Sequence, residues 1–161
     1  MKILDLGCSD NKVPGAIGVD IRTDKKADVI HDLNVFPYPF ETDSIDKVYA
    51  KHIIEHLSNP GSFIKEIYRI LKRGGEALIE TPHFSNYVAY SDPGHKIHYS
   101  YFTFRNLLRD CKFSLVKQEI TFYKSFRFFG IMFLANKYPE QYERFWTYIF
   151  PAENLVVKLK K

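Results

Sequence analysis

Short apolar runs recur through the first half of the chain, separated by polar turns and by one amphipathic segment. Five of them have the length of buried strands: residues 3–6, 16–21, 28–31, 45–50 and 76–80. Runs that are this short and nearly free of polar residues are typical of strands inside a parallel sheet. Together with the helical segment between the fourth and fifth runs, they predict an α/β domain with a mostly parallel sheet.

The amphipathic segment between residues 59 and 74 carries the clearest helix signals in the sequence. Asn59 can cap the helix, and Pro60 suits its first position. The apolar residues that follow at helical spacing form one stripe: Phe63, Ile64, Ile67, Ile70 and Leu71. Because Lys72 and Arg73 suit the negative end of a helix, we expect the helix to include them and to stop at Gly74 in a left-handed conformation.

The second half of the chain is less regular. We expect a second helix to begin near Thr103, and further strands over residues 113–122 and 154–159. Residues 123–150 interrupt the alternation, because they are rich in Phe and Tyr. We expect one or two helices there that cover one end of the sheet. The 161 residues are thus predicted to form a single domain with an aromatic helical cover at about residues 123–150.

Charge and aromatic residues are unevenly distributed. Residues 1–95 contain 11 Lys and Arg against 14 Asp and Glu, whereas residues 96–161 contain 12 against 5. Most of the Phe, Tyr and Trp residues lie between Phe84 and Phe150. A basic, aromatic surface can bind nucleic acid, so a non-catalytic module that binds RNA or a partner protein is one hypothesis. The alternative is that the aromatic residues form core while the lysines face water.

Cysteine content and hydropathy exclude several classes of protein. Cys8 and Cys111 are too few for a disulfide framework or a four-cysteine zinc site. The most apolar segment, residues 126–135, is shorter than the ~20 residues that cross a bilayer. The first residues show no signal-peptide pattern. We therefore expect a cytoplasmic protein without a membrane span.

Acidic and glycine residues stand at the ends of the first two predicted strands, where open parallel sheets bind ligands. Asp20 could accept hydrogen bonds from both hydroxyls of a ribose. A dinucleotide fold needs a glycine-rich turn that opens a full helix, yet Gly7 and Asp20 are too close in sequence to hold one. Asp5 and Asp10 would repel a phosphate but attract the sulfonium and ammonium of S-adenosylmethionine (SAM). Charge therefore favours SAM as the cofactor.

These residues are part of a longer series of motifs. In chain order they are Asp5-x-Gly7-x-Ser9, Gly18-Val19-Asp20-Ile21, His31-Asp32-Leu33, Phe40-Glu41-x-Asp43-Ser44-Ile45-Asp46-Lys47-Val48, Ile54-Glu55-His56-Leu57 and Ile70-Leu71-Lys72-Arg73-Gly74-Gly75. The series, which spans about residues 1–122, resembles the class I SAM-dependent methyltransferases with a type 11-like domain. The resemblance implies a Rossmann-like, seven-stranded, mostly parallel sheet with flanking helices and an antiparallel last strand. It also implies methyl transfer from SAM to an acceptor, small or macromolecular, that the sequence does not identify.

The resemblance implies a set of cofactor-binding positions: Asp5, Gly7, Ser9, Asp20, Ile21, Asp32, Leu33 and Ala50. The first three would form the loop around the methionine end of SAM, with Ser9 at the second glycine of the usual Gly-x-Gly. Asp20 would hold the ribose, with Ile21 beside the adenine, and Asp32 would reach the adenine amino group. Ala50 would lie near the methionine and the methyl group.

Two histidines are candidates for a base, which is needed only where the acceptor loses a proton. His52 follows the fourth predicted strand and His83 follows the fifth, so both belong to the ligand end of the sheet. Histidine titrates near neutral pH and is suited to that role. His95 is a less favoured candidate. It lies in residues 82–101, which we interpret as a substrate-facing lid.

Residues 52–56 also fit a different chemistry. His52-Ile53-Ile54-Glu55-His56 matches His-x-x-Glu-His, a pattern of zinc hydrolases. On a helix the two histidines would share a face, and Glu55 could activate a metal-bound water. The sequence offers no clear third ligand, and the methyltransferase resemblance explains Glu55-His56-Leu57 as a structural motif. We therefore expect no metal and regard the zinc-hydrolase hypothesis as the less favoured one.

Overall fold

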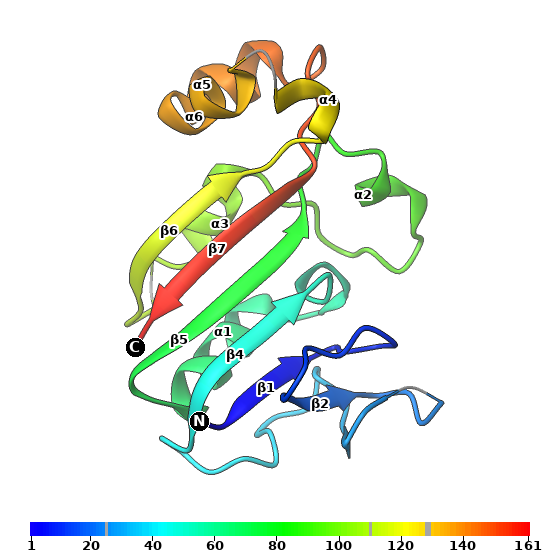
Figure 1. Ribbon diagram of the computed structural model, residues 1–161, viewed down its shortest axis with the longest axis vertical. Helices are drawn as coiled ribbons and strands as arrows, with labels where there is room; N and C mark the ends of the chain where they lie inside the picture. Colours follow the sequence, from blue (N-terminus) through cyan, green and yellow to red (C-terminus); the bar gives the residue numbers. More distant parts are fainter. Residues whose placement is uncertain (25, 110, 128–129) are drawn as a thin grey trace.

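Seven strands form one twisted sheet in the order β3-β2-β1-β4-β5-β7-β6 (Figure 1). The computed structural model describes residues 1–161 except residues 25, 110 and 128–129. The five strands that run parallel are β1 (Ile3–Leu6), β2 (Ile17–Asp20), β3 (Val29–Ile30), β4 (Ile45–Lys51) and β5 (Leu71–Pro82). β7 (Asn154–Lys160) lies between β5 and β6 (Ser114–Ile120) and is antiparallel to both. The predicted fold class, including the antiparallel last strand, is confirmed.

The longer strands bury one face more deeply than the other. In β4, β5 and β7 buried apolar residues such as Val48, Ile79 and Val157 alternate with half-buried ones such as Lys47, Glu80 and Lys158. Helices α1 (Pro60–Ile70) and α3 (Tyr101–Leu107) contact β5 and β6 and lie behind the sheet in Figure 1. Because successive side chains of a strand point to opposite faces, this alternation places the main core between the sheet and these helices.

Helix α1 begins as predicted but ends earlier. The Asn59 side chain accepts the N–H of Ser62, and Pro60 occupies the first turn. The buried residues of the helix are Glu66 and the members of the predicted stripe up to Ile70. The prediction that Lys72 and Arg73 end the helix is wrong, because Leu71 is already extended and pairs with Ile45 of β4. Strand pairing therefore begins directly after Ile70, the last buried residue of the helix.

The remaining helical segments are short. They are η1 (Ile54–His56), α2 (Val88–Ser91), α4 (Lys124–Arg127), α5 (Ile131–Lys137), α6 (Pro139–Gln141) and the single π-helical turn η2 (Tyr142–Trp146). The last four lie in the aromatic segment, where one or two helices were expected. In Figure 1 the yellow and orange helices α4, α5 and α6 lie beyond the end of β6. Among the residues described, no helix has the length and apolar content needed to span a membrane.

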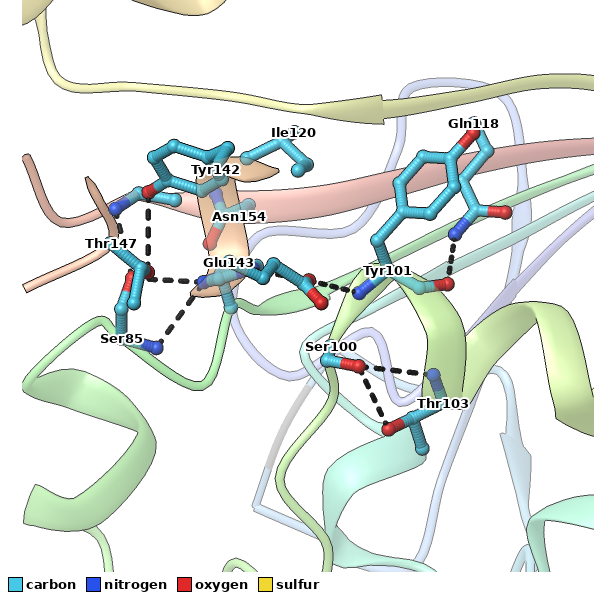
Figure 2. Close-up of polar contacts among 12 residues, drawn as sticks. Ser85, Ser100, Tyr101, Thr103, Gln118, Ile120, Tyr142, Glu143, Thr147 and Asn154 are labelled. Atoms are coloured by element: carbon cyan, nitrogen blue, oxygen red, sulfur yellow. Dashed lines mark hydrogen bonds and ion pairs between the residues drawn. The ribbon is translucent and has the colours of Figure 1, made fainter. Parts of the chain in front are cut away.

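Polar contacts join the aromatic segment to α3, as Figure 2 shows. Glu143 of η2 accepts the backbone N–H of Tyr101, the first residue of α3. Gln118 of β6 donates to the Tyr101 carbonyl. Helix α3 starts two residues before the expected Thr103, because the Ser100 side chain accepts the N–H of Thr103 and caps it.

Candidate functional site

The turn between β1 and β2 contains no helix, as its length predicted. Gly7 has φ +73° and Ser9 has φ +44°, so both adopt the left-handed region. A Cβ atom on Gly7 would lie 2.7 Å from the Ile53 side chain. Gly7 is therefore required for two reasons: the backbone conformation and the close approach of the segment after β4.

Asp20, the last residue of β2, fixes the shape of this turn. One carboxylate oxygen accepts the Ser9 N–H at 3.0 Å, and the other accepts the Arg22 N–H at 3.0 Å. Arg22 Nη2 also donates to Ser9 Oγ at 3.0 Å. The carboxylate is thus held in one orientation at the carboxyl ends of two adjacent parallel strands.

A cavity of about 190 Å³ opens beside this turn. Five of the eight cofactor positions implied by the resemblance line it: Gly7, Asp20, Ile21, Asp32 and Leu33. These residues come from the ends of β1 and β2 and from the segment after β3. The sheet order places the three strands side by side, so residues that are far apart in sequence face one space.

Five further residues line the same cavity: His31, Asn34, Ile53, His56 and Leu57. They were not among the cofactor positions derived from the sequence, although His56 was a ligand in the zinc-hydrolase hypothesis. Their neighbours in the sequence could have identified them. His31 adjoins Asp32, and Ile53, His56 and Leu57 lie at or next to the Glu55-His56 motif. Ile53 and Leu57 add an apolar wall to a cavity that carries two carboxylates.

The other three implied cofactor positions do not line the cavity. Asp5 is buried, and its carboxylate accepts the Val13 N–H at 2.7 Å. Burial raises the pKa of Asp5, an effect that the Val13 N–H and two lysines only partly offset. Ala50 is fully buried in β4, and Ser9 donates its backbone N–H to Asp20.

His52 stands immediately after β4 and is about half exposed, with φ +52°. Its Nδ1 lies 3.6 Å from Glu55 Oε1, and its Nε2 lies 3.9 Å from Glu80 Oε1. The nearby Glu55 carboxylate raises the pKa of His52 against the opposing effect of burial. The hypothesis of a single helix that places His52 and His56 on one face is wrong, because η1 comprises only Ile54–His56 and His52 has a left-handed backbone conformation.

His83, the second candidate base, is fully buried and held on both sides of its ring. Nδ1 lies 2.9 Å from Ser85 Oγ, and Nε2 lies 3.1 Å from Glu143 Oε1. The same glutamate oxygen accepts the Tyr101 N–H (Figure 2). His83 therefore joins the end of β5 to η2 and α3, and it is absent from the lining of the cavity beside Gly7.

Comparison with protein families gives one match: residues 14–79 match the methyltransferase domain. No curated protein matches the sequence significantly. Many solved structures share the fold, among them a SAM-dependent methyltransferase from Archaeoglobus fulgidus, with TM-score 0.74, 22% identity, and coverage of 99% of this chain and 86% of that one. An S-adenosylmethionine-dependent methyltransferase from Mesorhizobium loti has TM-score 0.69, 15% identity, and coverage of 99% and 90%.

The fold also carries other chemistry. The [4+2]-cyclase SpnF is similar to this chain with TM-score 0.64 and 16% identity, over 99% of this chain and 74% of that one. At such identities the likeness shows the fold, and the reaction has to be argued from the site. The two methyltransferase neighbours are described as SAM-dependent, and their likeness to this chain concerns the fold.

Proposed function

We propose that this chain, which has the fold of the class I SAM-dependent methyltransferases and the matching domain signature, binds SAM in the cavity beside Gly7 and transfers its methyl group to an acceptor. The observation that carries the proposal is the meeting of Asp20 and Asp32 in one cavity at the carboxyl ends of parallel strands. Both carboxylates face a common space, as a site for a cationic nucleoside requires.

The chemistry of the lining fits the two ends of a nucleoside. Asp20 already accepts two backbone N–H groups, which leave its remaining lone pairs available to ribose hydroxyls. Ile21, Leu33 and Leu57 offer apolar surface to an adenine ring, and Asp32 can accept its amino group. No helix begins in the β1–β2 turn, so the site lacks the positive helix end that a pyrophosphate favours.

We assign the methionine end of SAM to the turn that contains Gly7 and Ser9. This turn is close to the end of β4, which contains Ala50. SAM, when bound, supplies an activated methyl group on a sulfonium. The protein then has to align the acceptor with that methyl group and to exclude water. His52 is the better placed of the two predicted bases, since its ring is half exposed, whereas that of His83 is enclosed and bonded on both nitrogens.

Calorimetric titration with SAM and with S-adenosylhomocysteine tests the proposal. We expect both ligands to bind the wild type and Asp20→Asn to bind them about 10–100-fold more weakly, because a hydrogen bond to a charged group contributes about 1.5–3 kcal/mol. Asp43→Asn is the matched control. Asp43 is an exposed aspartate at φ +56°, a conformation that asparagine tolerates.

Three results would overturn the proposal. One is the absence of SAM binding to the wild type at millimolar cofactor. Another is wild-type affinity in Asp20→Asn, which would remove the ribose from this carboxylate. The third is a loss of affinity in Asp43→Asn equal to that in Asp20→Asn, which would place the cofactor elsewhere.

A further inference from the structure

Glu55 has a buried carboxylate oxygen to which no described residue donates a hydrogen bond. The residue is 2% exposed. Its Oε2 accepts the Thr81 hydroxyl at 2.9 Å, whereas Oε1 has no hydrogen-bond partner among the residues that the structure describes. A buried carboxylate oxygen without a hydrogen bond is costly, and His52 Nδ1, at 3.6 Å, is too far away to donate one, so the oxygen can accept a bound cation.

Besides His52, two histidines from different segments lie near this oxygen. A ring nitrogen of His56 and one of His95 lie within 4.8 Å of each other and of a Glu55 carboxylate oxygen. His95 Nε2 is 4.0 Å from Glu55 Oε1. The rings meet edge to face, with centroids 4.6 Å apart. His56 belongs to η1, and His95 to the connection between α2 and α3, so only the fold brings them together.

The Nδ1 atoms of both rings are engaged in the way that metal-binding histidines usually show. His56 Nδ1 lies 3.1 Å from the Gly94 carbonyl oxygen, and His95 Nδ1 lies 3.0 Å from that of Ala89. A carbonyl can only accept, so each Nδ1 carries the proton and donates it. In the neutral rings this leaves the Nε2 lone pairs free as ligands.

We infer that Glu55, His56 and His95 form a binding site for a divalent transition metal ion of the zinc class. Two nitrogens and one carboxylate oxygen are a donor set that Zn²⁺ accepts, at bond lengths of about 2.0–2.2 Å. Donors around one such ion lie about 3–4 Å apart, so the longest separation in the cluster, up to 4.8 Å, has to shorten by about 1–2 Å. Two of the three ligands come from the His-x-x-Glu-His segment, but His95, not His52, completes the set.

The inferred site lies next to the cofactor cavity, because His56 also lines that cavity. It would reinforce a connection that the backbone already makes, since the Lys96 N–H donates to the Glu55 carbonyl at 2.8 Å. A metal ion would therefore hold η1 and the α2–α3 connection together as one wall. This inference rests on side-chain geometry alone and stands independently of methyl transfer.

Metal titration of the untagged, chelator-treated protein tests the site. We expect one equivalent of Zn²⁺ to bind by calorimetry, and one equivalent of Co²⁺ to give the visible absorption of a low-coordinate nitrogen and oxygen site. Glu55→Gln, His56→Ala and His95→Ala should each abolish the Co²⁺ spectrum. Thr81→Val, which removes only the hydroxyl that orients Glu55, should weaken Zn²⁺ binding by about 10–100-fold.

His98→Ala is the matched control, because His98 lies in the same connection, is exposed and is outside the cluster. It should bind Zn²⁺ as the wild type does. The inference fails if the wild type binds no metal, or if the ligand variants retain wild-type affinity. Circular dichroism checks the fold of each variant, and Glu55→Gln keeps the side-chain shape if a histidine variant does not fold. Failure here leaves SAM binding untouched, so the two proposals are separable.

Discussion

The carboxylate of Asp20 accepts the backbone N–H of Ser9 at 3.0 Å and thereby ties the end of β2 to the turn that follows β1. The relationship explains how a serine can occupy the position of the second glycine. Ser9 adopts φ +44°, which an L-residue avoids, and the fixed carboxylate holds its N–H in place. The turn keeps the shape of a glycine turn at a cost in local strain.

Ser9→Gly should therefore stabilise the protein. Glycine adopts a positive φ without strain, and the N–H that donates to Asp20 is retained. We expect the free energy of unfolding to rise by about 1 kcal/mol or less, because relief of about 1–2 kcal/mol of strain is offset by the greater freedom of glycine in the unfolded chain. Urea denaturation measures the change. A fall in stability would mean that the contact of Ser9 Oγ with Arg22 outweighs the strain.

Gly7→Ala and Gly15→Ala separate strain from crowding. Both glycines have a positive φ, +73° and +77°, but a Cβ would overlap Ile53 only at Gly7. Gly15→Ala should cost about 1–2 kcal/mol of strain alone, and Gly7→Ala a further ~1–3 kcal/mol from overlap with a packed neighbour. Thermal denaturation compares the two variants. Equal losses would show that Ile53 moves away freely.

Glu66→Gln should remove an acid-sensitive part of the stability. Burial disfavours the Glu66 carboxylate, but hydrogen bonds from Arg69 and from the Tyr38 N–H outweigh it and lower the pKa of Glu66. A lowered folded-state pKa stabilises the protein above the unfolded value of about 4.3, and the contribution disappears as the pH falls through the folded value. We expect a loss of about 1.5–3 kcal/mol in the variant at pH 7.

The measurement is urea denaturation of both proteins from pH 7 down to acid. The two stability curves should converge below the lowered folded-state pKa of Glu66, because both side chains are then neutral. A difference that stays constant with pH would contradict the assignment. The loss would then reflect changed packing of α1 against the segment around Tyr38.

Glu143→Gln tests the link between η2, α3 and the end of β5. Glu143 accepts from Tyr101 and contacts His83, and its side chain is only 11% exposed. We expect a loss of about 1–3 kcal/mol of stability, because a charged acceptor is replaced in a nearly enclosed network. Glu140→Gln is the control, since Glu140 is exposed and its contact with Arg144 should contribute less than about 0.5 kcal/mol. Similar losses in both variants would refute the link.

Much of the fold could be predicted from local sequence. The short apolar runs predicted five parallel strands, and Asn59 and Pro60 predicted where α1 begins. The end of α1 could not be predicted in this way, because Leu71 continues the helical stripe and yet pairs with Ile45. Local propensity and strand pairing compete at such a boundary, and the long-range pairing prevails.

The candidate site, too, could be predicted only in part from the sequence. From the sequence by itself, Gly7 and Asp20 could be chosen from their places at predicted strand ends. The family resemblance added Ile21, Asp32 and Leu33, and all five residues line one cavity. Only the tertiary structure decided that Asp5 is buried, that His83 is enclosed, and that His95 faces Glu55 from 40 residues away. The physical reason is that periodicity and turn chemistry act over a few residues, whereas burial and the meeting of side chains depend on how distant segments pack.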